Sequence, residues 1–118
     1  MDEELTKEPE GQLTVDVFQT DNEIIVQSTV AGVSDEDLEI NITGESVTVR
    51  GQREKEEKIE EKDYFYRECF WGSFSRSIIL PQEIDPDRST AILKNGILTI
   101  RMPKVERQKA RKIKVKID

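Results

Sequence analysis

The sequence predicts an all-β fold, an antiparallel sandwich of two sheets that forms one domain. Three observations support this prediction. Apolar and polar residues alternate in several short segments, turn-forming residues separate these segments, and no segment of useful length has the apolar spacing of a helix. The 118 residues suffice for one two-layer core and not for two domains.

Seven segments have the alternating pattern of a strand with one buried face. Their order indicates three hairpins, the last of which turns at Asn95-Gly96, a strong signal for a two-residue turn. Residues 34–37 suffice for only one helical turn. The predicted strands are residues 13–18, 23–29, 38–43, 47–50, 74–80, 89–93 and 97–102.

A charged segment is followed directly by an aromatic one. Residues 51–63 are nearly all charged, lack an apolar stripe and are interpreted as a solvated loop. Residues 64–71 contain five of the seven aromatic side chains. Such a segment at the end of a long charged loop is unusual in a monomer, so we expect part of it in the core and part in an interface.

The net charge of −7 is unevenly distributed. From Arg101 to the end, eight basic residues and two acids give a local charge of +6, which leaves −13 for the first hundred residues. A basic tail on an acidic body favours contact between copies of the chain. The tail has no aromatic residue for stacking on bases, so we expect no nucleic-acid partner.

The residue types argue against an enzyme. The chain has no His, the commonest general base and metal ligand, and its single Cys69 has no partner for a disulfide or a zinc site. No phosphate-binding loop is present, and Gly44, Gly51, Gly72 and Gly96 are assigned to turns. We expect no cofactor and no metal. Without a secretory signal or a transmembrane run, we expect a cytoplasmic protein with no membrane partner.

The last residues form a separate pattern. From Lys112 onward, Lys alternates with Ile113, Val115 and Ile117, whose side chains share one face of an extended segment. This strand either pairs as an edge of its own sheet or docks its aliphatic face on a neighbouring copy. The linker length permits both arrangements, and of the two we favour docking on a neighbour.

Two central segments resemble a known family. Residues 91–100, followed by Pro103-Lys104, closely resemble the A-x-x-x-N-G-V-L signature of the α-crystallin domain of small heat-shock proteins. Residues 72–76, with Leu80-Pro81, resemble the stretch that precedes this signature.

Two outer segments extend the resemblance over almost the whole chain. Residues 30–33, with Asp37-Leu38, resemble the P-G-x-x-x-x-D-[IL] segment, although Ala31 stands where many members have Pro. Residues 113–117 resemble the C-terminal I-x-I/V motif. With these four segments in the family order, the chain resembles a small heat-shock protein of the bacterial type, and the match covers about residues 13–117.

The resemblance implies an immunoglobulin-like β-sandwich, with residues 1–12 as a disordered arm, 13–104 as the α-crystallin domain and 105–118 as the tail. It also implies a homodimer in which a loop strand, about residues 63–68, is exchanged between partners. Arg76 matches a family arginine at the dimer region and would pair with an acid. The implied interface residues are Asp63, Tyr64, Phe65, Tyr66, Arg67, Glu68 and Arg76.

The tail motif in the family binds a groove between two edge strands of a neighbouring subunit. By strand order and parity, this groove involves the segments 38–42 and 89–93. The alternative is that some of these side chains face the interior of the sandwich. The implied groove residues are Leu38, Ile40, Ile42, Ser89, Ala91 and Leu93.

The function implied by the resemblance is an ATP-independent holdase that binds partly unfolded client proteins and prevents their aggregation. Two alternatives stay open, a co-chaperone module of the same sandwich class and a purely structural self-assembly protein. Family members usually carry a longer, Phe-rich arm, whereas residues 1–12 are acidic with Leu5 as the one large aliphatic. We therefore expect a dimer or a small oligomer, with an arm that is either naturally short or truncated.

Overall fold

The structure is a computed structural model and describes residues 11–55, 57–106 and 113–118. The predicted arm up to residue 10 and the linker 107–112, including Lys112, lie outside the described residues. The described residues contain no α-helix. Their three 3-10 turns are η2 (Asp35–Asp37), η3 (Glu61–Asp63) and η4 (Pro86–Arg88).

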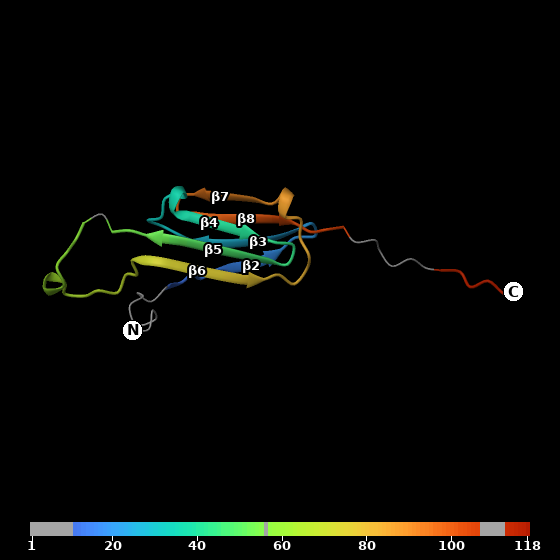
Figure 1. Cartoon of the computed structure of the whole chain (residues 1–118), viewed down its shortest axis with the longest axis horizontal. Coiled ribbons are helices and arrows are strands. Elements are labelled where there is room, and N and C mark those ends of the chain that lie inside the picture. The colour runs from blue at the N-terminus through green and yellow to red at the C-terminus, as the bar shows by residue number, and fades with distance from the viewer. Residues whose placement is uncertain (1–10, 56, 107–112) are drawn as a thin grey trace, which may run out of the picture.

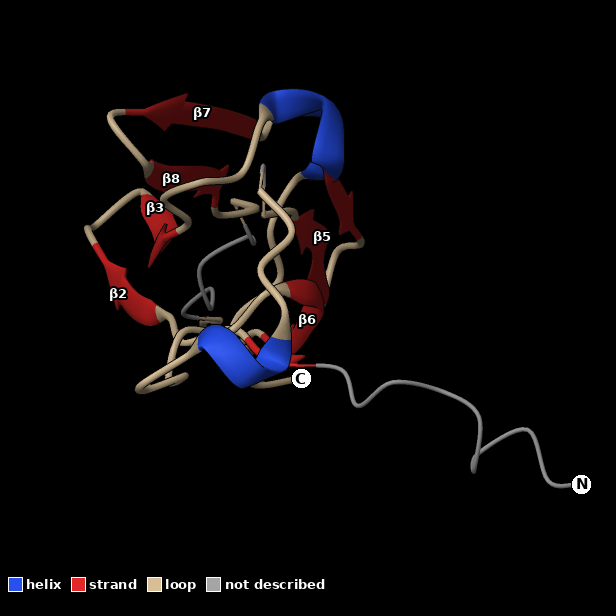
Figure 2. Cartoon of the chain, turned by 90° about the vertical axis from the view of Figure 1, so that its left-hand side faces the viewer, coloured by secondary structure: helices blue, strands red, loops and turns tan. Residues whose placement is uncertain are grey.

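Two four-stranded sheets pack face to face, which confirms the predicted sandwich (Figure 2). One sheet has the order β1-β6-β5-β4 and the other β2-β3-β8-β7. Every pair is antiparallel except β1 with β6, which is parallel. The strands are β1 (Gly11–Gln12), β2 (Asp16–Gln19), β3 (Glu23–Thr29), β4 (Leu38–Ile42), β5 (Ser46–Arg53), β6 (Gly72–Ile79), β7 (Thr90–Lys94) and β8 (Ile97–Pro103).

All three predicted hairpins are present, as β2–β3, β4–β5 and β7–β8 (Figure 1). At the β7–β8 turn, Asn95 and Gly96 have φ of 53° and 76°, the left-handed backbone that a tight hairpin turn needs. Asn and Gly tolerate this conformation better than other residues, which explains why the dipeptide was a dependable signal.

The core consists of the inward-facing side chains of both sheets. It is aliphatic apart from Phe74 and the sulfur of Met102, and its members come from every strand but β1, β2, β4 and β7 and from the connecting loops. The four edge strands therefore contribute no fully buried apolar side chain. The buried core residues are Leu13, Ile24, Val26, Val30, Val47, Val49, Phe74, Leu80, Ile84, Leu98, Ile100 and Met102.

The predicted strand 13–18 is wrong as a single element. The chain pairs with β6 at Gly11 and Gln12, crosses between the sheets and pairs with β3 from Asp16 onward. Two side-chain hydrogen bonds hold the crossing, from Arg76 Nη1 to the carbonyl oxygen of Leu13 at 3.2 Å and from Ser28 Oγ to that of Thr14 at 2.7 Å. The backbone N–H of Leu13 also donates to the carbonyl oxygen of Ser75 at 3.4 Å. The crossing residues close one side of the sandwich.

Gly51 was assigned to a turn, and this is wrong, because it lies inside β5 opposite Phe74. A Cβ atom at Gly51 would lie 2.5 Å from Phe74 Cζ and 3.0 Å from Leu38 Cδ2. The aromatic ring fills the space that a side chain would take. The absent side chain therefore permits close packing inside a strand, one of the recognised uses of Gly.

We predict that Gly51→Ala lowers the free energy of unfolding by about 1–3 kcal/mol, because the added methyl group overpacks the core. Gly44→Ala is the matched control, since its Cβ would lie 3.6 Å from Glu83 Cγ, an ordinary contact. We expect it to change stability by less than about 0.5 kcal/mol. Urea denaturation measures both, and equal stability of the two variants would contradict the packing of Gly51 against Phe74.

Candidate client-binding and assembly surfaces

Four strands end the two sheets, and none has a sheet neighbour on its outer side within the described chain. β4 and β7 end the sheets on one side, and β1 and β2 end them on the other (Figures 1 and 2). Edge strands expose backbone N–H and C=O groups that can pair with another chain. These edges are therefore candidate surfaces for assembly and for binding other chains.

Apolar residues line the inward side of β4. Ile40 and Ile42 lie opposite Val49 and Val47, which are fully buried, so their side chains share the core side of the sheet. Leu38 has the same parity. All three are half-buried and pack against the core while keeping part of their surface open to solvent. They are thus both interior-facing and accessible at the rim.

β7 presents a smaller apolar rim. Leu93 and Ala91 lie opposite the buried Leu98 and Ile100 and point the same way, with Leu93 half-buried and Ala91 exposed. Ser89 lies outside the strand, which begins at Thr90 and not at the predicted position 89. Its hydroxyl donates to the carbonyl oxygen of Asp85 at 2.8 Å and so completes the turn η4.

The loop between β5 and β6 projects from one end of the sandwich (Figure 1). Phe65 is 97% exposed and Tyr66 is 85% exposed. Residues 64–71 form no strand in the single chain, and Asp63 ends the short turn η3. The aromatic side chains at the loop tip therefore have no apolar cover from their own molecule.

Cations stacked on aromatic rings connect the two arms of this loop. Lys55 Nζ lies 4.6 Å from the ring centre of Tyr64 and 5.8 Å from that of Trp71, and it donates to the Tyr64 hydroxyl. The guanidinium of Arg67 also stacks on the Tyr64 ring, with its Cζ atom 5.1 Å from the ring centre. Such pairs contribute about 0.5–1 kcal/mol each at exposed sites. They orient the loop without burying its tip.

Arg76 lies on β6, where its guanidinium donates to the carbonyl oxygen of Leu13 in the same chain. It is half-buried and supports the crossing between β1 and β2. The described chain shows no ion pair from Arg76 to an acid. Its place in a dimer interface stays a prediction.

The tail motif is fully available. Ile113, Val115 and Ile117 are 85%, 91% and 96% exposed, and residues 113–118 form no strand in the single chain. The tail leaves the sandwich at the end opposite the β5–β6 loop (Figure 1). Three aliphatic side chains in water are unfavourable, so they call for an apolar surface elsewhere.

The position of β2 at the edge of its sheet was not among the sequence predictions, although the hairpin it forms with β3 was. Its residues Val17 and Phe18 are exposed large apolar side chains. Phe18 lies opposite Ile25, which is buried although it faces outward from the sandwich. Alternation within residues 13–18 was visible in the sequence, but the edge position depends on strand order, which the sequence does not show.

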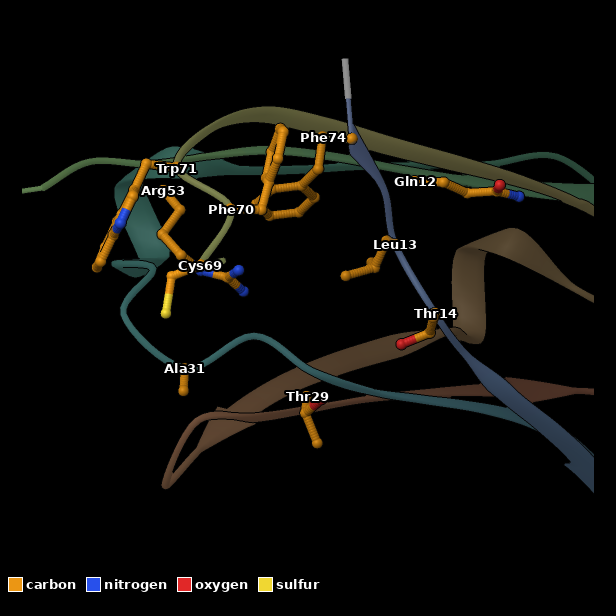
Figure 3. Close-up of a pocket in the computed structure, with 11 residues that line it drawn as sticks. Gln12, Leu13, Thr14, Thr29, Ala31, Arg53, Cys69, Phe70, Trp71 and Phe74 are labelled. Atoms are coloured by element: carbon orange, nitrogen blue, oxygen red, sulfur yellow. The ribbon is translucent and has the colours of Figure 1, made fainter. Parts of the chain in front are cut away.

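A pocket of about 640 Å³ opens at the loop end of the sandwich, and we call it the end pocket (Figure 3). The pocket could not be predicted from the sequence, because its walls come from segments far apart in the chain. Arg53, read as part of a solvated charge run, instead ends β5 and points into this pocket. The lining residues are Gly11, Gln12, Leu13, Thr14, Thr29, Ala31, Arg53, Cys69, Phe70, Trp71 and Phe74.

Other classes of site find no support in the described ranges. They hold no group of three or more potential ligand side chains that could bind a metal ion. Along the same ranges, no helix has the length and apolarity that crossing a bilayer requires.

Residues 11–118 match the model of the Hsp20/alpha crystallin family. The chain is 41% identical over 101 residues to small heat shock protein C2 of Rickettsia felis, covering 86% of this chain and 66% of that protein. It is 37% identical over 100 residues to spore protein SP21 of Stigmatella aurantiaca, covering 85% of this chain and 59% of that one. The chain thus spans about 59–66% of the length of these curated relatives.

Solved structures agree with the sequence relatives. Heat shock protein 16.0 from Schizosaccharomyces pombe superposes with a TM-score of 0.76 at 34% identity, covering 91% of this chain and 77% of that chain. A small heat-shock protein from Xylella fastidiosa gives 0.72 at 27% identity, covering 89% and 96%. The chain belongs to the Hsp20/alpha crystallin family of small heat-shock proteins.

Proposed function

We propose that this chain is an ATP-independent holdase that binds partly unfolded proteins and keeps them from aggregating. The observation that carries the proposal is the pair of edge strands β4 and β7, which end both sheets on one side with half-buried aliphatic side chains at their rims. A partly unfolded protein exposes the complementary features, apolar side chains and unpaired strand backbone. Both can be satisfied at such an edge by strand addition.

The tail supplies an occupant for the same surface in the resting assembly. Ile113, Val115 and Ile117 repeat every second residue, as do Leu38, Ile40 and Ile42 on β4. Two segments with this period can pair as strands with their apolar sides together. We propose that the tail of one copy lies between β4 and β7 of a neighbour, and that client and tail compete for this groove.

Dimer formation is assigned to the β5–β6 loop. We propose that the segment around Phe65 and Tyr66 adds to the free edge of β2 in the partner, which is lined by Val17 and Phe18. This pairing would cover the exposed side chains of both segments at once. Aromatic and β-branched cross-strand pairs stabilise a sheet by about 0.2–1 kcal/mol each. Arg76 lies on β6, in the other sheet, and its hydrogen bond to Leu13 would hold the chain that leads into β2.

Capture of this kind needs no nucleotide, because it is a binding equilibrium that shifts with client exposure. The acidic body, with −13 in the first hundred residues, would keep loaded complexes dispersed. No enzyme activity, cofactor, nucleic acid or membrane enters the proposal. Its cytoplasmic location stays a prediction.

We predict that the chain suppresses the light scattering of a heat-labile client at near-stoichiometric ratio without ATP. The physical reason is that edges and tails bind exposed client segments reversibly. A matched control is an immunoglobulin-like domain of similar size and charge that lacks the apolar edge. Scattering equal to that of the client alone would contradict the holdase proposal.

We predict that Ile113→Ser with Val115→Ser dissociates assemblies larger than the dimer, because it removes two apolar side chains worth about 1.5–3 kcal/mol each when buried. Lys114→Ser is the matched control, since Lys114 has the opposite parity and faces away from the docked side. Native mass spectrometry measures the subunit number. An unchanged distribution in the double variant would contradict tail docking while leaving the holdase proposal to the scattering assay.

A further inference from the structure

The end pocket has a feature that neither the edges nor the tail explain. Its walls are apolar and aromatic, formed in part by Leu13, Phe70 and Trp71 (Figure 3). The guanidinium of Arg53 points into the pocket between these walls, with its Cζ atom 5.7 Å from the ring centre of Phe74. Arg53 Nε is buried and has no hydrogen-bond partner among the described residues.

A buried N–H of a cation that lacks an acceptor destabilises the folded protein, and an anionic acceptor would offset this effect. No described carboxylate fills this role. The ion pairs between described residues are Lys62–Glu60 and Arg101–Glu23, and neither involves Arg53 or the nearby Lys55. The pocket is therefore suited to an occupant that combines a carboxylate with an apolar side chain.

The residues immediately before the pocket have this chemistry. Gly11 lines the pocket and is joined covalently to segment 2–10, which is therefore tethered at this site. This segment contains five acids and one base, with Leu5 as its one large aliphatic. The tail is a poor alternative, because its six basic residues between 107 and 116 would be repelled by Arg53.

We propose that the end pocket binds segment 2–10 of the same chain, with the side chain of Leu5 against Phe70 and Leu13 and the carboxylate of Glu3 accepting from Arg53. In an extended segment, Glu3 and Leu5 share one face, which lets both enter the pocket together. Five residues lie between Leu5 and Gly11, so the six Cα–Cα steps span at most about 20 Å, enough for the segment to reach back over the rim. The tether gives the segment an effective concentration in the millimolar range, so weak contacts suffice.

Trp71 is the one Trp of the chain and lines the pocket, so its fluorescence reports on occupancy. Acrylamide quenching of Trp71 fluorescence is measured in the full chain and in two variants. One variant combines Glu3→Gln with Leu5→Ser, and the other is Arg53→Gln. In both variants we expect acrylamide to quench Trp71 more strongly than in the parent, because the segment no longer covers the ring. The matched control is Glu8→Gln, which removes an acid outside the proposed contact and is expected to leave quenching unchanged.

A second measurement does not depend on the stability of those variants. A synthetic peptide of residues 1–10 is titrated into a chain that lacks residues 2–10, and Trp71 emission follows binding. The expected dissociation constant rises about tenfold for a peptide with Glu3→Gln, because a hydrogen bond between charged groups is lost. Urea midpoints equal to that of the parent show that the shortened chain is folded.

Two results would overturn the proposal. Equal quenching in the parent and in both variants, with no response to the peptide, would show that the pocket does not bind this segment. Protection of Trp71 that disappears on dilution, in step with dissociation of subunits, would assign the occupant to another copy and contradict docking within one chain. Protection that is independent of concentration supports it.

Discussion

The organisation of this protein depends on the unpaired backbone of its four edge strands. A sandwich of two open sheets cannot pair these edges within itself, and each exposed N–H and C=O group invites pairing with another chain. Many proteins blunt such edges with bulges or proline. Here neither β4 nor β7 contains a proline, and both expose aliphatic rims. The edges are therefore surfaces to be covered, and the proposed dimer, tail docking and client capture are three ways of covering them.

The distribution of charge and apolar residues fits the same constraint. A chain with 35% hydrophobic and 36% charged residues has a compact core, and the core ends before the edge strands begin. The most exposed large apolar side chains lie at the loop tip, in the tail motif and at the end of β6, where Ile79 is exposed. If assembly covers these patches as proposed, oligomer size and client binding are coupled, because they use the same surfaces.

The sandwich and all three hairpins could be predicted from the sequence because they depend on local patterns. Apolar and polar residues alternate within the strands, and turn-forming residues such as Asn95-Gly96 separate the strands. The sequence did not predict features that require a distant partner. The division of residues 13–18 between two sheets depends on pairing with β6, and the position of Gly51 inside β5 depends on the ring of Phe74. The end pocket escaped for the same reason, since Arg53 and Phe70 meet only after folding.

The candidate surfaces were predicted through the family motifs more than through the alternation itself. Parity placed Leu38, Ile40 and Ile42 on one side of an edge strand, and the structure places them there. Ser89 falls outside the strand because its hydroxyl caps the preceding turn. Residues 64–71 and 113–118 form no strand in the single chain, and their pairing with other copies stays a proposal.

Hydrogen–deuterium exchange of the backbone amides in β4 and β7 shows directly whether tail and client share these edges. We expect these amides to exchange slowly in the assembled protein, faster when the tail is removed, and slowly again when an unfolded client is bound. Exchange that is the same in all three states would show that the edges are not the surfaces that tail and client share, and would contradict the account.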